Sequence, residues 1–135
     1  MPLSIQDALI HLMVVTASSD SGISGRESGL IGSLIERSPA FAGYEAERLT
    51  AVANECIDLI NGPAGLDSVL DHAIEALPEK LQDTAYALAV EVAVVDLQLP
   101  QEELRLLEMI RDRLTIDRLT TAAIETAARA RMRKA

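Results

Sequence analysis

The stretch HLMVVTASSDSGISGRESGLIGSL, residues 11–34, decides the fold, because its pattern recurs in ALAVEVAVVDLQLPQEELRLLEMI, residues 87–110. In both copies an apolar segment leads to an aspartate, and a glutamate follows seven residues later. The apolar positions on both sides stay in register: Leu12, Val14, Ala17, Leu30, Ile31 and Leu34 correspond to Leu88, Val90, Ala93, Leu106, Leu107 and Ile110. Self-similarity at a fixed spacing is the signature of an internal repeat. The sequence therefore predicts two copies of an apolar helix, an acidic turn and a second apolar helix.

Composition and periodicity favour an all-α protein. Aromatic residues are nearly absent, and every long segment shows the 3.6-residue period of a helix. We expect a compact bundle of about seven helices, covering residues 4–18, 24–37, 44–60, 66–77, 78–95, 100–113 and a last one from 115 or 117 into the C-terminal tail. The length of 135 residues fits a single domain, 1–135. Segments 8–17 and 85–95 are apolar nearly all round, so they are expected at the centre of the bundle.

The charge of the chain is unevenly distributed. The net charge is -9, yet five of the twelve basic residues lie in the last eighteen positions. An acidic body repels phosphate, which argues against nucleic acid as a partner. The basic tail either complements a helix dipole and stays solvated, or docks on an anionic membrane or protein partner. The N-terminus lacks a basic signal-peptide region and no apolar stretch is long enough for a transmembrane segment, so a cytoplasmic location is expected.

Helix capping is the simplest interpretation of the two turns. Ser24 and Glu27 have the spacing of a capping box, which satisfies backbone N–H groups at a helix start. Pro100 can begin the second helix, with Glu103 in its positively polarised first turn. Capping accounts for both glutamates, but it does not account for the aspartates that precede the caps.

A metal site is the second interpretation of these turns. Its candidate ligands are Asp20, Glu27, Asp96 and Glu103, with Glu91 and Glu102 crowding the second turn. Two carboxylates about 6 Å apart repel by roughly 3 kcal/mol at an effective dielectric constant near 20, so such a cluster favours a counter-ion. Oxygen ligands suit calcium or magnesium better than zinc. The positive end of a helix opposes cation binding, and the spacing differs from that of an EF-hand.

Other reactive side chains give no catalytic pattern. His11 lies in an apolar segment and is expected to be a hydrogen-bonded core histidine, whereas His72 lies on a polar helix face and is expected to be solvated. Cys56 is the only cysteine and fits a small buried apolar position. There is no phosphate-binding glycine loop and no serine with a neighbouring base. The sequence therefore favours a protein that is not an enzyme.

The sequence also resembles a known family. The stretch AYALAVEVAVVD, residues 85–96, is followed by LPQEE, residues 99–103, and HLMVVTASSD, residues 11–20, is followed by Ile23, Ser24 and Glu27. Both stretches are similar to the TerB-like family of bacterial tellurite-resistance proteins, in which an apolar helix runs into an aspartate-glycine turn and an amphipathic helix. The glycine is displaced to Gly22 in the first copy and is missing from the second.

The resemblance implies a helical bundle with a surface acidic cluster proposed to bind metal ions, at the positions of Asp20, Glu27, Asp96 and Glu103. It also implies a role in tellurite, metal or oxidative stress. We therefore expect a non-enzymatic stress-response protein that binds a divalent cation through this cluster. The alternative is a protein-protein interaction module whose acidic face docks a basic partner without metal. The resemblance also extends to related domains that are fused to co-chaperone J-domains and act there as interaction modules.

Overall fold

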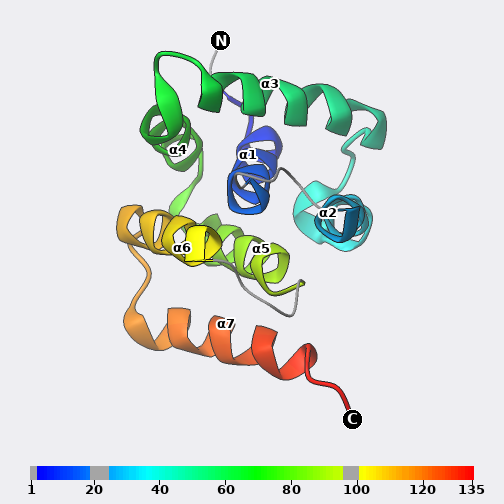
Figure 1. The fold of residues 1–135 in the computed structure, drawn as a ribbon, viewed down its shortest axis with the longest axis vertical. Helices are drawn as coiled ribbons and strands as arrows, with labels where there is room; N and C mark the ends of the chain where they lie inside the picture. The colour runs from blue at the N-terminus through cyan, green and yellow to red at the C-terminus, as the bar shows by residue number, and fades with distance from the viewer. Residues whose placement is uncertain (1–2, 19–24, 96–100) are drawn as a thin grey trace.

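The structure, a computed structural model, describes residues 3–18, 25–95 and 101–135, without the side chains of 101–103. Within these ranges all regular secondary structure is helical, which confirms the predicted all-α class (Figure 1). The α-helices are α1 (Ile5–Ala17), α2 (Gly25–Arg37), α3 (Leu49–Asn61), α4 (Gly65–Glu75), α5 (Gln82–Val94), α6 (Gln101–Arg113) and α7 (Arg118–Arg131). Three short 3-10 helices join them: η1 (Pro39–Phe41), η2 (Ala46–Arg48) and η3 (Glu79–Leu81).

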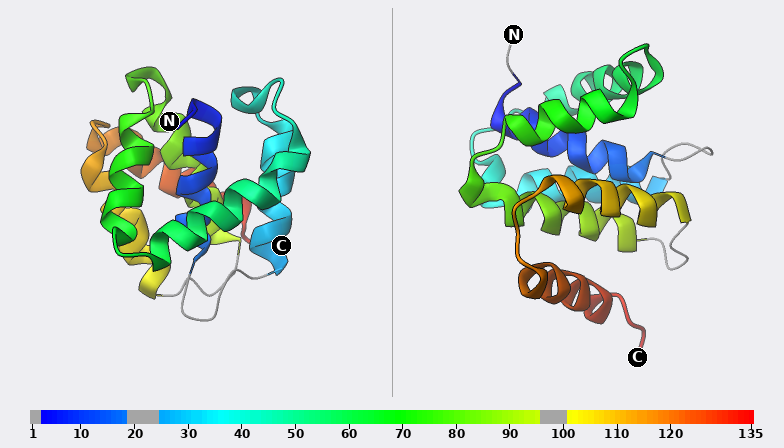
Figure 2. Two further views of the ribbon diagram at one scale, coloured as in Figure 1. Left: turned by 90° about the horizontal axis from the view of Figure 1, so that it is seen from above. Right: turned by 90° about the vertical axis from the view of Figure 1, so that its left-hand side faces the viewer.

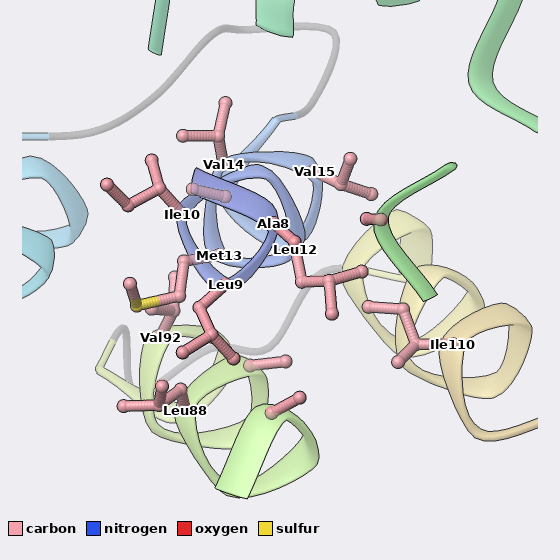
Figure 3. Packing of buried hydrophobic residues seen from close by; sticks show 14 of the residues in the cluster. Ala8, Leu9, Ile10, Leu12, Met13, Val14, Val15, Leu88, Val92 and Ile110 are labelled. Atoms are coloured by element: carbon pink, nitrogen blue, oxygen red, sulfur yellow. The ribbon is translucent and has the colours of Figure 1, made fainter. Parts of the chain in front are cut away.

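Helix α1 is the centre of the bundle. All residues from Ala8 to Ala17 are buried, because α2, α3, α4, α5 and α6 surround this helix (Figure 1). Figure 3 shows Leu9 and Met13 facing Leu88 and Val92 of α5, while Leu12 points towards Ile110 of α6. A helix that is apolar on every side must bury all of its faces, so the predicted central position of segment 8–17 is confirmed.

Helix α5 is the second buried helix, and it separates α1 from α7. It packs against α1 and α6 on its inner sides and against α7 on the outside (Figure 1). Its charged interruption, Glu91, forms an ion pair with Arg131 at the end of α7. A basic residue of the tail therefore attaches the outermost helix to the core of the bundle.

Side-chain caps fix the starts of α1 and α7, each within one residue of a start expected at residue 4 or 117. Ser4 precedes α1, and its Oγ accepts a hydrogen bond of 3.1 Å from the backbone N of Asp7. Asp117 precedes α7, and its Oδ1 accepts one of 2.8 Å from the backbone N of Thr120. Both bonds satisfy N–H groups that have no partner within the helix.

Two other predicted starts are wrong. The segment expected to be helical from residue 44 first forms η2, and α3 begins only at Leu49. Gly43 has a positive φ of 79°, and the side chains of Tyr44 and Arg48 both bind Asp7 of α1 at 3.0 Å. These tertiary contacts hold the segment in turns. Similarly, the segment expected from residue 78 forms η3 before α5 begins at Gln82.

The internal repeat stays a prediction. Helices α1 and α5 pack together, and their C-terminal ends lie on the same side of the molecule in both views of Figure 2. The buried apolar side chains of α1 and α5 belong to one cluster. In the described part of the chain, no helix has the length and apolar character needed to cross a membrane.

Candidate functional site

Most of the predicted acidic cluster lies outside the described residues. This is the case for Asp20 and Asp96, for the proposed caps Ser24 and Pro100, and for the side chains of Glu102 and Glu103. Within the described ranges, no group of three or more histidine, cysteine, aspartate or glutamate residues is placed to hold a metal ion. The proposed combination of Asp20, Glu27, Asp96 and Glu103 therefore stays a prediction.

Glu27 is the one predicted ligand whose side chain is described. It lies in the first turn of α2 and is only 3 % exposed. Burial of a carboxylate costs free energy unless other groups compensate its charge, and the N-terminal end of a helix supplies part of that compensation. The position of Glu27 fits both a capping box and a cation ligand.

The helices that precede the two predicted acidic turns are arranged side by side. Helix α1 ends at Ala17 and α5 ends at Val94, and these two ends lie on the same side of the molecule (Figure 2). The observed arrangement matches what two acidic turns on one face require.

A cleft of about 550 Å³ lies elsewhere, where α1, α3 and α4 meet near the N-terminal segment. We name it the histidine cleft, because both histidines of the chain line it. Its lining combines four apolar residues with four titratable ones: Leu3, Leu59, Val69, Ala76, His11, His72, Glu55 and Glu75. This volume lies within the range of about 300–1,000 Å³ that is common for small-molecule sites.

His11 is the most buried polar group of the histidine cleft. It is 3 % exposed, and its imidazole makes no hydrogen bond to any residue that the structure describes. Its burial was predicted correctly, but the expected hydrogen bond is not found among the described residues, and His11 instead lines the cleft. Burial lowers the pKa of His11 from its ordinary value, while Glu55 and Asp7 act in the opposite direction. The imidazole is therefore neutral at pH 7 and can accept a hydrogen bond.

The other three titratable residues of the histidine cleft are exposed. Glu55 belongs to α3, whereas His72 and Glu75 belong to α4. The solvated position expected for His72 is confirmed. The sequence carried one signal of this site, the spacing of three between His72 and Glu75, which places both on one helix face. It gave no indication that Glu55 and His11 would face them.

Two further titratable groups are buried without forming a site. Burial raises the pKa of the Cys56 thiol to about 12, so this cysteine fits the predicted apolar position. Tyr86 is 1 % exposed and donates a hydrogen bond of 2.5 Å to Glu125 of α7, which also accepts one of 3.3 Å from Arg111. This network joins α5, α6 and α7.

Known proteins give no guide to the function of these features. In comparisons with protein-family models, curated proteins and solved structures, no match to this chain is found. Its chemistry is therefore argued from the residues and geometry described above.

Proposed function

We propose that this protein is a non-enzymatic, cytoplasmic stress-response protein that binds a divalent cation, calcium or magnesium, through acidic turns after α1 and α5. One observation carries the proposal: the ends of α1 and α5 lie on the same side of the molecule (Figure 2). The burial of Glu27 at the start of α2 supports it, because a carboxylate withdrawn from water has lost the solvent that would otherwise compete with a cation. Asp20, Glu27, Asp96 and Glu103 are the proposed ligands.

A cation that binds only the folded protein must stabilise it. With free cation at 100 times its dissociation constant, mass action adds about 2.7 kcal/mol to the free energy of unfolding. The test is thermal unfolding of chelator-treated protein with and without 5 mM magnesium or calcium chloride. For a weak site, this concentration exceeds the dissociation constant by roughly this factor. We expect the cation to raise the melting temperature of the wild type.

The double variant Asp20→Asn/Asp96→Asn should lose most of this rise. The variant Glu45→Gln/Glu47→Gln is the matched control, because it removes the same charge from two exposed positions in and beside η2. An equal rise in the wild type and in the aspartate variant would place the cation elsewhere. If the wild type itself shows no rise, the cation proposal fails.

A protein-interaction module is the second candidate function. The observation in its favour is an acidic surface on α3 and α4, where Glu55, Asp58 and Glu75 are exposed together with Asp67 and Asp71, both of which pair with Arg113. Such a face attracts a basic partner and repels an acidic one.

The free energies of unfolding of the wild type and of Asp20→Asn/Asp96→Asn, measured in chelator at pH 7, distinguish the two candidate functions. If Asp20→Asn/Asp96→Asn stabilises the protein, its aspartates repel one another and await a cation; if it destabilises the protein, they serve as structural groups and the interaction module is favoured.

A further inference from the structure

We infer that the histidine cleft is a binding site for an aliphatic diamine or polyamine, distinct from the acidic turns. In this site Glu55 and Glu75 pair with two ammonium groups, His11 accepts a hydrogen bond, and the apolar lining contacts the methylene chain between the ammonium groups. The inference does not depend on the proposed cation site, since no residue belongs to both.

The apolar lining of the cleft suits a hydrocarbon chain. Leu59 of α3 and Val69 and Ala76 of α4 line the cleft together with Leu3. Leu59 is also one of the few large apolar side chains that stay exposed in the described part of the protein. Covering it with methylene groups removes apolar surface from water, which favours a ligand with an alkyl chain over an inorganic ion.

The charge of the cleft selects a cation. Two carboxylates line it, and none of the described lysine or arginine residues does. The ion pairs formed among the described residues involve other carboxylates: Asp7, Asp67, Asp71, Glu91 and Glu125. Glu55 and Glu75 are therefore available to a ligand, and they belong to different helices. Two separated carboxylates match a ligand with a positive charge at each end.

His11 gives the site a directed polar contact. It is more than nine-tenths buried, it lines the cleft, and its ring makes no hydrogen bond to the described residues. A polar group buried in this way gains free energy from a donor that reaches it. An ammonium group has three donors and no acceptor, so it suits a neutral imidazole.

A transition metal is the competing ligand, because imidazole and carboxylate groups also bind zinc, nickel and copper. A metal requires its ligands to converge on one point. The four titratable residues of the cleft are not placed in that way, since the described residues contain no group of three or more that could hold a metal. A diamine needs only separate contacts along its length, and the two glutamates of the lining belong to different helices, α3 and α4.

The test is an NMR titration of the full chain at pH 7.5 with 1,5-diaminopentane. The chain has two histidines, so each imidazole gives a resolved ring signal, and His72→Gln assigns them. We expect saturable shifts of the His11 ring signals. Glu55→Gln and Glu75→Gln should each weaken binding at least tenfold, whereas Glu47→Gln, an equal charge change at an exposed position outside the cleft, should leave it within twofold.

Other probes decide which part of the ligand is recognised. We expect n-pentylamine, which has one ammonium group, to bind at least tenfold more weakly than the diamine, and 1,5-pentanediol not to bind. Because Glu55 and Glu75 are exposed, their variants should keep the wild-type helical circular dichroism, so a loss of binding reports on the site.

Several results would overturn the inference. These are an absence of saturable His11 shifts, equal binding of the wild type and both glutamine variants, or tighter binding of zinc chloride that requires both histidines. Equal binding of n-pentylamine would refute recognition by two carboxylates. The variant Asp20→Asn/Asp96→Asn should bind the diamine like the wild type, so failure of one site is distinguishable from failure of the other.

Discussion

Replacing Tyr86 by Phe tests how α7 is held to the bundle. The tyrosine ring is buried and stays in the variant, so the change removes only the hydroxyl that donates to Glu125 at 2.5 Å. A hydrogen bond to a charged group contributes about 1.5–3 kcal/mol. The lower end applies here, because the Glu125 side chain is 26 % exposed to water and keeps its 3.3 Å contact with Arg111. We therefore expect Tyr86→Phe to lower the free energy of unfolding by about 1.5 kcal/mol.

Urea unfolding followed by circular dichroism measures this loss. With a slope of roughly 1.5–2 kcal/mol per molar urea, the midpoint should fall by roughly 0.7–1 M. A double-mutant cycle with Glu125→Gln isolates the pair from other effects of each change, and the coupling should exceed 0.5 kcal/mol, the level expected for residues in contact. A loss below roughly 0.5 kcal/mol, or a coupling near zero, would refute the view that this bond holds α7 on α5.

Three other perturbations have clear expected outcomes. Ser4→Ala should lower the free energy of unfolding by about 1 kcal/mol, because it removes the side-chain cap of α1. Ser38→Ala is the control and should change this free energy little, because Ser38 occupies a cap position but forms no side-chain capping bond. Urea unfolding compares the two variants. Ile110→Ala should lower the free energy of unfolding by about 2–5 kcal/mol, because Ile110 is fully buried. Leu119→Ala should lower it by less than about 0.5 kcal/mol, because Leu119 is 82 % exposed, and urea unfolding measures both changes. Cys56, whose pKa is raised to about 12 by burial, should resist a thiol reagent at pH 8 until urea exposes it; rapid modification of the folded protein would contradict its burial.

The sequence predicts the helices best where one local signal acts alone. Helices α1 and α7 begin within one residue of the expected positions 4 and 117, because Ser4 and Asp117 form capping bonds that depend only on residues three positions apart. The helix starts near residues 44 and 78 were wrong, because contacts with distant residues and irregular backbone decide them. Tyr44 and Arg48 reach back to Asp7, a partner that no local pattern identifies.

The two candidate sites differ in the same respect, because one follows a local sequence pattern and the other depends on residues that are far apart in the sequence. The acidic turns were predicted from the sequence because the pattern repeats along the chain, and both the turns and their ligand geometry stay predictions. The histidine cleft had no such pattern, since its carboxylates and imidazoles come from α1, α3 and α4. The hydrogen bond expected for His11 is not found among the described residues, and this residue lines the cleft between these three helices.

The amino-acid sequence by itself determined the all-α class and the central position of segment 8–17. The reason is that helical periodicity and an apolar surface on every side are properties of a single segment. Only the tertiary structure decided that Glu91 pairs with Arg131, that Tyr86 binds Glu125, and that His11 and Glu55 line the same cleft. Each of these contacts joins different helices, and their side chains meet only because burial of apolar faces fixes how the helices pack.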